Sequence, residues 1–213
     1  MIKASFGDRL DAFIHKLFPF LFHRAKPLDP NTLTVIGALV SLVAAWALAT
    51  GEFLAAGFLI MFGGFFDLVD GVVARHYGTS TSFGAFLDST LDRFVDMALF
   101  LGVILYYAGH GEAEVAVLAA FVLITSVITS YAKARAETQI KVLEGGLFER
   151  GERVGLLAAG AATDLIPWAL VVLAVGGAVT VAQRFLAAYR ELERLDAARS
   201  APEAVAEDSG AAQ

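Results

Sequence analysis

Long apolar stretches alternate with short polar ones through most of the chain, and their lengths predict membrane-spanning helices. The apolar runs cover residues 33–50, 53–66, 83–107, 115–131, 154–162 and 168–185. A helix needs about 20 residues to cross a bilayer, so the second, fourth and fifth runs must extend into their polar flanks. We therefore predict an all-α integral membrane protein built as a bundle of six transmembrane helices.

The N-terminal segment has a different pattern. Over residues 4–23, apolar side chains recur near helical spacing and charged side chains lie on the other faces. This pattern is typical of an amphipathic helix in the membrane interface. We expect one membrane domain over 1–194, with the amphipathic helix and a cap in 1–30 and the six transmembrane helices in 31–194. The polar residues 195–213 are expected to form a disordered tail.

Composition supports the membrane assignment and narrows the chemistry. Hydrophobic residues make up 57% of the 213 positions and the mean hydropathy is +0.66, whereas the apolar share of soluble domains is about one half. Cysteine is absent, so a bound metal must be held by carboxylates or histidine, a ligand set that includes the oxygen donors preferred by hard cations. We expect membrane lipids, and no nucleic acid, as partners.

The distribution of charge predicts the orientation. All 16 Lys and Arg residues fall on one side of the predicted topology, while the three opposite loops carry acids and His110. Because short loops rich in Lys and Arg stay in the cytoplasm, both termini should be cytoplasmic. An even number of spans in the cell membrane satisfies this expectation.

Four aspartates fall within or beside the predicted spans, where a charge costs about 2.5–3.5 kcal/mol. Asp67 and Asp70 are three residues apart, and Asp88 and Asp92 are four apart on the next helix, so each pair shares a helix face. The short turn between the helices lets the four carboxylates converge. Like charges in one pocket repel unless they are protonated or share cations. Oxygen ligands of this kind suit Mg²⁺, Mn²⁺ or Ca²⁺.

The residues alone leave other interpretations open. Intramembrane acids could form the proton or cation relay of a transporter, including a divalent-cation transporter. Gly71, Ala74 and Gly84 could serve close helix packing, or could let a phosphate approach the backbone. A non-catalytic scaffold is not expected to retain four acids that each cost insertion energy.

A family motif covers the aspartates. The run from Asp67 to Asp92 reads D-L-V-D-G-V-V-A-R, then eight residues, then G-A-F-L-D-S-T-L-D. It resembles the CDP-alcohol phosphotransferase motif D-x2-D-G-x2-A-R-x8-G-x3-D-x3-D at every defined position. The resemblance implies a homodimer with six spans and an amphipathic N-terminal helix. It also implies metal-dependent transfer of a phosphatidyl group from a CDP-diacylglycerol-type lipid to an alcohol, with release of CMP.

The resemblance assigns roles to the aspartates. Asp67, Asp70 and Asp88 would be ligands of Mg²⁺ or Mn²⁺, two ions in all. Asp92 would be the base that takes the proton of the attacking hydroxyl and would also contact the second metal. Asp96 lies outside the motif, one turn further along the same face, and we interpret it as a residue that supports the site or pairs helices.

Residues in and around the motif are expected to bind the CDP-lipid. We assign to this group Asn31, Thr34, Asp67, Gly71, Ala74, Arg75, Thr81, Ser82 and Gly84. For the first two, in the segment P-N-T-L-T, a helix cap is the alternative. For the arginine the alternative is an interfacial anchor.

Basic residues outside the motif indicate the acceptor. Lys133, Arg153 and Arg184 lie at the cytoplasmic ends of the fourth, fifth and sixth predicted spans. Together they would suit the phosphate of a phosphorylated alcohol, although each alone could be a membrane anchor. As a set they resemble the phosphatidylinositol-phosphate synthase branch of the family, whose acceptor is inositol 1-phosphate. Gly151 stands where that branch often has Pro, and glycerol 3-phosphate, giving phosphatidylglycerol phosphate, is the alternative acceptor.

Overall fold

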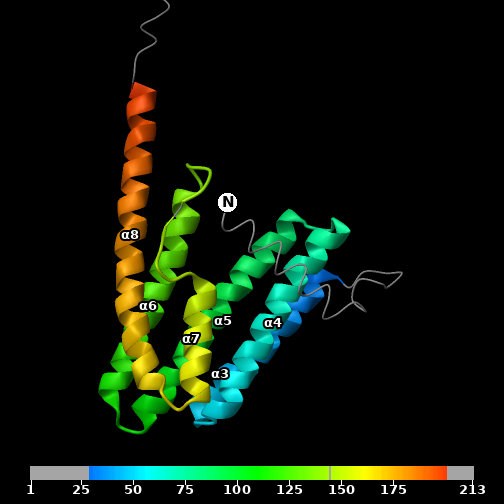
Figure 1. The fold of residues 1–213 in the computed structure, drawn as a ribbon, viewed down its shortest axis with the longest axis vertical. Helices are drawn as coiled ribbons and strands as arrows, with labels where there is room; N and C mark the ends of the chain where they lie inside the picture. Colours follow the sequence, from blue (N-terminus) through cyan, green and yellow to red (C-terminus); the bar gives the residue numbers. More distant parts are fainter. Residues whose placement is uncertain (1–28, 144, 201–213) are drawn as a thin grey trace, which may run out of the picture.

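The structure, a computed structural model, describes residues 29–143 and 145–200, and this part of the chain is all-helical. Six helices follow one another (Figure 1): α3 Pro30–Thr50, α4 Phe53–Tyr77, α5 Ser82–Gly109, α6 Ala113–Ala136, α7 Arg150–Ala162 and α8 Ile166–Ser200. Each contains one of the predicted apolar runs and is longer than that run. The amphipathic helix predicted over 4–23 lies outside the described residues.

Local capping sets the ends of the helices that carry the aspartates. Gly78 ends α4 in a left-handed conformation with φ 62°, which glycine adopts without strain. The hydroxyl of Thr81 accepts a hydrogen bond from the backbone N–H of Gly84 at 2.9 Å and so caps α5. At the start of α3, the carboxylate of Asp29 accepts from the N–H of Asn31 at 3.1 Å. The caps at Gly78 and Thr81 fix the connection 78–81 between α4 and α5.

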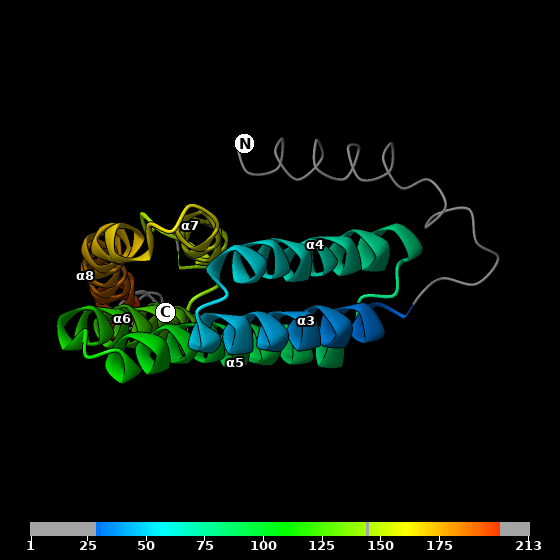
Figure 2. The ribbon, with the colours of Figure 1, turned by 90° about the horizontal axis from the view of Figure 1, so that it is seen from below.

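The helices form two layers. In one layer α3 packs on α5 and α5 on α6, and in the other α4 packs on α7 and α7 on α8. Contacts of α3 with α4, and of α6 with α8, close the layers onto each other. Figure 2 shows α4 lying over α3 with α7 beside it. The two helices that carry the aspartates therefore belong to opposite layers and face each other near the connection that joins them.

A shared apolar core holds the layers together. Its fully buried side chains include Leu48 of α3, Ile60 of α4, Phe100 of α5, Leu157 of α7 and Leu170 of α8. Between helices that lie in lipid, close van der Waals packing of such side chains, rather than exclusion of water, provides the attraction. On α4 the buried residues of this core precede Asp67, and on α5 they follow Asp92. The core therefore does not fill the space between the polar residues at the connected ends of these helices.

Four of the helices, α3, α4, α6 and α8, are long and apolar enough to cross a membrane. Large apolar side chains also cover the outer surface, among them Trp46, Phe58 and Trp168, which are 72%, 67% and 71% exposed. Such a surface is unfavourable in water. These features indicate a multi-pass membrane protein.

The other two predicted spans, α5 and α7, differ from these four helices in charge or in length. The first half of α5 carries two charged residues of the motif, Asp88 and Asp92. Helix α7 has 13 residues and is about 20 Å long, which is shorter than the hydrocarbon core of about 30 Å. Because α7 is short and begins with charged residues, its first turn suits a position at one membrane surface, where polar groups are in contact with water.

Helix α8 continues through Ser200, further than the sequence predicts. Residues 195–200 are helical, so the disordered tail predicted to begin at 195 is wrong over these positions. Leu195, Ala197, Ala198 and Arg199 within this segment are residues that favour helix. An ion pair of 2.7 Å between Arg194 and Glu191, one turn apart, adds to this preference. The rest of the predicted tail lies outside the described residues.

Candidate active site

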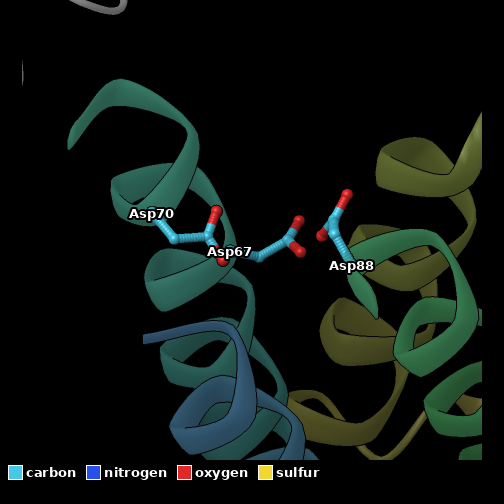
Figure 3. A group of neighbouring side chains, drawn as sticks. All are labelled: Asp67, Asp70 and Asp88. Atoms are coloured by element: carbon cyan, nitrogen blue, oxygen red, sulfur yellow. The ribbon is translucent and has the colours of Figure 1, made fainter. Parts of the chain in front are cut away.

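Three of the motif aspartates form one cluster of carboxylates between α4 and α5. One carboxylate oxygen from each of Asp67, Asp70 and Asp88 lies within 4.8 Å of the other two. Figure 3 shows Asp67 and Asp70 extending from α4 toward Asp88 on α5. Asp70 is buried and the other two are half-buried. Hard oxygen donors this close together fit a divalent cation.

Helix α3 positions the buried member of the cluster. The hydroxyl of Thr34 donates a hydrogen bond of 2.5 Å to Oδ2 of Asp70, and both residues are buried. The same hydroxyl lies 3.0 Å from the carbonyl oxygen of Pro30. Thr34 was predicted to contact the nucleotide, and the structure shows that it also orients a candidate metal ligand.

A cavity of about 170 Å³ opens beside Asp70 and Asp88. It brings together most of the residues predicted to bind the CDP-lipid: Asn31, Thr34, Gly71, Ala74, Arg75, Thr81 and Gly84. From that predicted set, Asp67 and Ser82 are not among the described residues that line it. Four residues without a predicted role complete the lining, the polar Thr79 and Ser80 and the apolar Pro30 and Ala85. We call this space the donor cavity, after the residues in its lining that were predicted to bind the CDP-lipid.

Two glycines keep the donor cavity open. A Cβ atom at Gly84 would lie 2.9 Å from Oδ1 of Asn31 and 3.1 Å from Oγ1 of Thr81. A Cβ atom at Gly71 would lie 3.2 Å from a guanidinium nitrogen of Arg75. These distances are shorter than ordinary van der Waals contact. The motif glycines therefore leave space for the side chains of Asn31, Thr81 and Arg75 at the cavity.

Asp92 is not a member of the three-aspartate cluster, and it is paired with an arginine. Its Oδ1 lies 3.1 Å from Nη2 of Arg150, the first residue of α7. The same guanidinium lies 3.2 Å from Asp67 through Nη1 and 3.2 Å from Asp96 through Nε. The forked donors of arginine allow one side chain to bridge carboxylates from two helices. The sequence did not indicate a role for Arg150 in the site. The available signals were its position one turn before Arg153, a predicted site residue, and the excess of aspartates over basic residues in the motif.

A second cavity, also of about 170 Å³, has Asp92 in its lining. The structure brings the three predicted acceptor residues to it, Lys133 from α6, Arg153 from α7 and Arg184 from α8. Its other lining residues are Arg93, Asp96, Ser130, Glu149 and Arg150. We call this space the acceptor cavity.

Two arginines of the acceptor cavity are held in place although they are almost fully buried. Arg153 and Arg184 are 3% and 5% exposed. Arg153 pairs with Asp96 at 3.5 Å and donates to the carbonyl of Phe148 at 3.3 Å, and Arg184 donates to the carbonyl of Thr129 at 2.6 Å. Nε of Arg153 is buried without a hydrogen-bond partner among the described residues. An unpaired buried donor costs about 1–3 kcal/mol, so an anion in this cavity would be favoured.

The comparison with known families decides the class of enzyme. The family model described as CDP-alcohol phosphatidyltransferase matches residues 28–182. The chain belongs to the CDP-alcohol phosphatidyltransferase family. The matched range contains the aspartate cluster, the donor cavity and every residue of the acceptor cavity except Arg184. The CDP-alcohol phosphotransferase resemblance of the motif is therefore confirmed.

Relatives within the CDP-alcohol phosphatidyltransferase family share most of the chain. The phosphatidylinositol phosphate synthase of Streptomyces avermitilis is 39% identical, covering 99% of this chain and 93% of that protein. The phosphatidylinositol phosphate synthase of Mycobacteroides abscessus is 40% identical, covering 78% of this chain and 80% of that protein.

Solved structures of the family have the same fold. The crystal structure of Mycobacterium tuberculosis phosphatidylinositol phosphate synthase with CDP-DAG bound gives a TM-score of 0.72 at 29% identity, covering 84% of this chain and 93% of that one. The structure of that enzyme in complex with manganese and citrate gives a TM-score of 0.72 at 28% identity, covering 86% and 88%.

Proposed function

We propose that this protein transfers the phosphatidyl group of CDP-diacylglycerol to inositol 1-phosphate, releasing CMP and forming phosphatidylinositol phosphate for phospholipid biosynthesis. The observation that carries the proposal is the pair of cavities around the aspartates. The donor cavity adjoins Asp70 and Asp88, while Asp92 lines the cation-rich acceptor cavity. The family supports the CDP-linked donor, and relatives that are phosphatidylinositol phosphate synthases support the acceptor.

Asp67, Asp70 and Asp88 are proposed to hold two divalent ions, Mg²⁺ or Mn²⁺, with Asp92 contacting the second. The spacing of the three clustered carboxylates supports this assignment, as does the manganese complex of the Mycobacterium tuberculosis relative. When bound, the ions would neutralise the diphosphate and the charge that develops on the departing CMP. On the donor side, Arg75 is proposed to contact the diphosphate by charge-assisted hydrogen bonds.

The acceptor side performs positioning and proton transfer. Lys133, Arg153 and Arg184 are proposed to hold the phosphate of the acceptor, which leaves its hydroxyl groups free. A hydroxyl oxygen attacks the phosphorus that carries the diacylglycerol, and the bond from that phosphorus to the CMP oxygen breaks. The hydroxyl proton passes to the carboxylate of Asp92. The side chain of Asp92 is 18% exposed, which leaves it accessible from the cavity.

The membrane topology completes the proposal. We propose one membrane domain over 1–194 with six spans, an N-terminal amphipathic helix, and both termini and the active site on the cytoplasmic side of the cell membrane. The four long apolar helices and the one-sided distribution of Lys and Arg support it. A site at the cytoplasmic end of α4 and α5 would be reached by a water-soluble acceptor and by a lipid held in the bilayer. A homodimer is expected from the family resemblance.

A panel of alcohols tests the proposed acceptor. With CDP-diacylglycerol and Mn²⁺, the purified protein is expected to release CMP more than about 100-fold faster with inositol 1-phosphate than with free inositol or serine, because a site built for phosphate is left with unpaired cations by those alcohols. CMP release measured with each alcohol in parallel provides the comparison. Faster release with glycerol 3-phosphate would contradict the acceptor assignment, and Mn²⁺ flux into vesicles without CMP release would favour a transporter.

The hydroxyl that orients Asp70 provides a test of the metal assignment. Thr34→Val keeps the shape of the side chain but removes the hydrogen bond to Asp70, and it is expected to weaken Mn²⁺ binding by about 10–100-fold. Thr34→Ser, which keeps the hydroxyl, is the matched control. Titration of the purified variants with Mn²⁺, followed by electron paramagnetic resonance, measures the affinity. Equal affinity in Thr34→Val and the wild type would rule out this supporting role.

A further inference from the structure

Arg150 lies between two spaces of different chemistry. It lines the acceptor cavity, and it also lines a smaller cavity of about 30 Å³ that contains Asp67 and Asp92. Its side chain is 27% exposed, so it is neither a surface anchor nor a fully enclosed core residue. A cation in this position can interact with the aspartates or with a ligand of the acceptor cavity.

The partners of Arg150 fall into two classes. Its Nε lies 3.2 Å from Asp96, which is 5% exposed and has no proposed contact with a metal ion. Its two Nη atoms lie 3.2 Å from Asp67 and 3.1 Å from Asp92, both of which are proposed to contact the divalent ions. Binding of those ions would remove the partners of the Nη atoms but leave the contact with Asp96.

A guanidinium that loses two carboxylates has an alternative in the acceptor cavity. Arg153, one turn along α7, shares Asp96 with Arg150 and lines the same cavity. A phosphate in that cavity would offer acceptor oxygens in the bidentate geometry that arginine binds well. Without the divalent ions, by contrast, Arg150 is occupied by the aspartates and is less available to an anion.

We propose that Arg150 is a fourth cation for the acceptor phosphate, paired with Asp67 and Asp92 until divalent ions take those carboxylates and then available to the phosphate. This inference rests on the proposed function. It makes the binding of divalent ion and phosphate cooperative through one side chain. The coupling is reciprocal: the factor by which Mn²⁺ tightens phosphate binding equals the factor by which phosphate tightens Mn²⁺ binding.

Direct attraction between the ions and the phosphate would also produce cooperativity, so a control cation is needed. Arg93 lines the acceptor cavity too, but its guanidinium donates to the carbonyl of Ser89 in its own helix. Arg93→Gln should weaken phosphate binding by a similar factor with and without Mn²⁺. Arg150→Gln should instead remove the part of the coupling that passes through the shared arginine.

The experiment measures binding rather than turnover. Inorganic phosphate and inositol 1-phosphate are titrated into the purified full-length protein in detergent by calorimetry, with and without saturating Mn²⁺. In the wild type, Mn²⁺ is expected to tighten binding by about tenfold or more, in Arg150→Gln by less than about threefold, and in Arg93→Gln by about the wild-type factor. Electron paramagnetic resonance of Mn²⁺ with and without phosphate should give the same factors.

The outcomes separate this inference from the proposed function. A wild-type coupling factor in Arg150→Gln would overturn the role of Arg150 while leaving the acceptor cavity intact. Failure of the wild type to bind either phosphate ligand, with or without Mn²⁺, would overturn the acceptor site itself. If Arg150→Gln does not fold, Arg150→Lys replaces it. A single ammonium cannot hold Asp96 and a phosphate in the way a guanidinium can, so its coupling should be at least about threefold weaker, and an unchanged factor would also overturn the inference.

Discussion

Replacing Asp92 by asparagine is expected to lower kcat for CMP release by about 10²–10⁴-fold, the range for loss of a general base. Asparagine has the size of aspartate and keeps an oxygen that can accept from Arg150, whose guanidinium lies 3.1 Å from the present carboxylate. It cannot take a proton from the attacking hydroxyl. Initial rates at saturating CDP-diacylglycerol and inositol 1-phosphate, with Mn²⁺ present, measure the loss.

Asp96→Asn is the matched comparison for that result. Asp96 lies one turn further along α5 and contacts Arg150 and Arg153, but it has no proposed proton-transfer role. Its replacement should act mainly on the KM for the acceptor, through the two arginines, while the Asp92 variant should act on kcat. Undiminished turnover in Asp92→Asn would exclude it as the base.

Replacing Arg153 by glutamine is expected to raise the KM for inositol 1-phosphate by about 100-fold, because hydrogen bonds from a charged group are worth about 1.5–3 kcal/mol each. The KM for CDP-diacylglycerol should change little, because Arg153 is not among the lining residues of the donor cavity. Steady-state kinetics with each substrate varied in turn separate the two effects.

Two further variants distinguish a specific effect of Arg153→Gln on acceptor binding from a general loss of folding. Arg153→Lys keeps the positive charge and should recover part of the affinity for the acceptor. Arg75→Gln, which changes the donor cavity, should show the opposite pattern, with a raised KM for CDP-diacylglycerol. Thermal unfolding in detergent checks each protein. A KM for inositol 1-phosphate that is unchanged in Arg153→Gln would contradict the assignment of this cavity to the acceptor.

Much of the helical order could be predicted from hydropathy, because a chain in lipid must satisfy its backbone hydrogen bonds within each segment. The convergence of Asp67, Asp70 and Asp88 also followed from local spacing and a short connection. Helix ends were harder to predict. The apolar signal of α7 begins four residues after its first residue, Arg150, and α8 extends through polar positions that hydropathy cannot assign.

Contacts between side chains of distant helices could not be predicted from the sequence. Arg150 and Asp67 are 83 positions apart, and their contact depends on α7 packing against α4, which no local pattern specifies. The hydrogen bond from Thr34 to Asp70 likewise depends on the rotation of α3 against α4. The pairing of Asp92 could not be predicted for the same reason, since it depends on how helices from different layers pack. The motif groups Asp92 with the other aspartates, but the structure places it against an arginine from another layer.

The two cavities are lined by largely different helices, and this separation has a consequence for how enzymes of this family acquire new acceptors. The donor cavity is lined by α3, α4, the connection after α4 and the start of α5, whereas the acceptor cavity is lined by α5, α6, α7, the residue before α7 and α8. Among the described helices, only α5 contributes to both. Under the proposed assignment of the two cavities, substitutions in the last three helices are expected to alter the choice of alcohol without changing nucleotide recognition. Helix α5 is then the element in which a new acceptor site must remain compatible with the existing donor site.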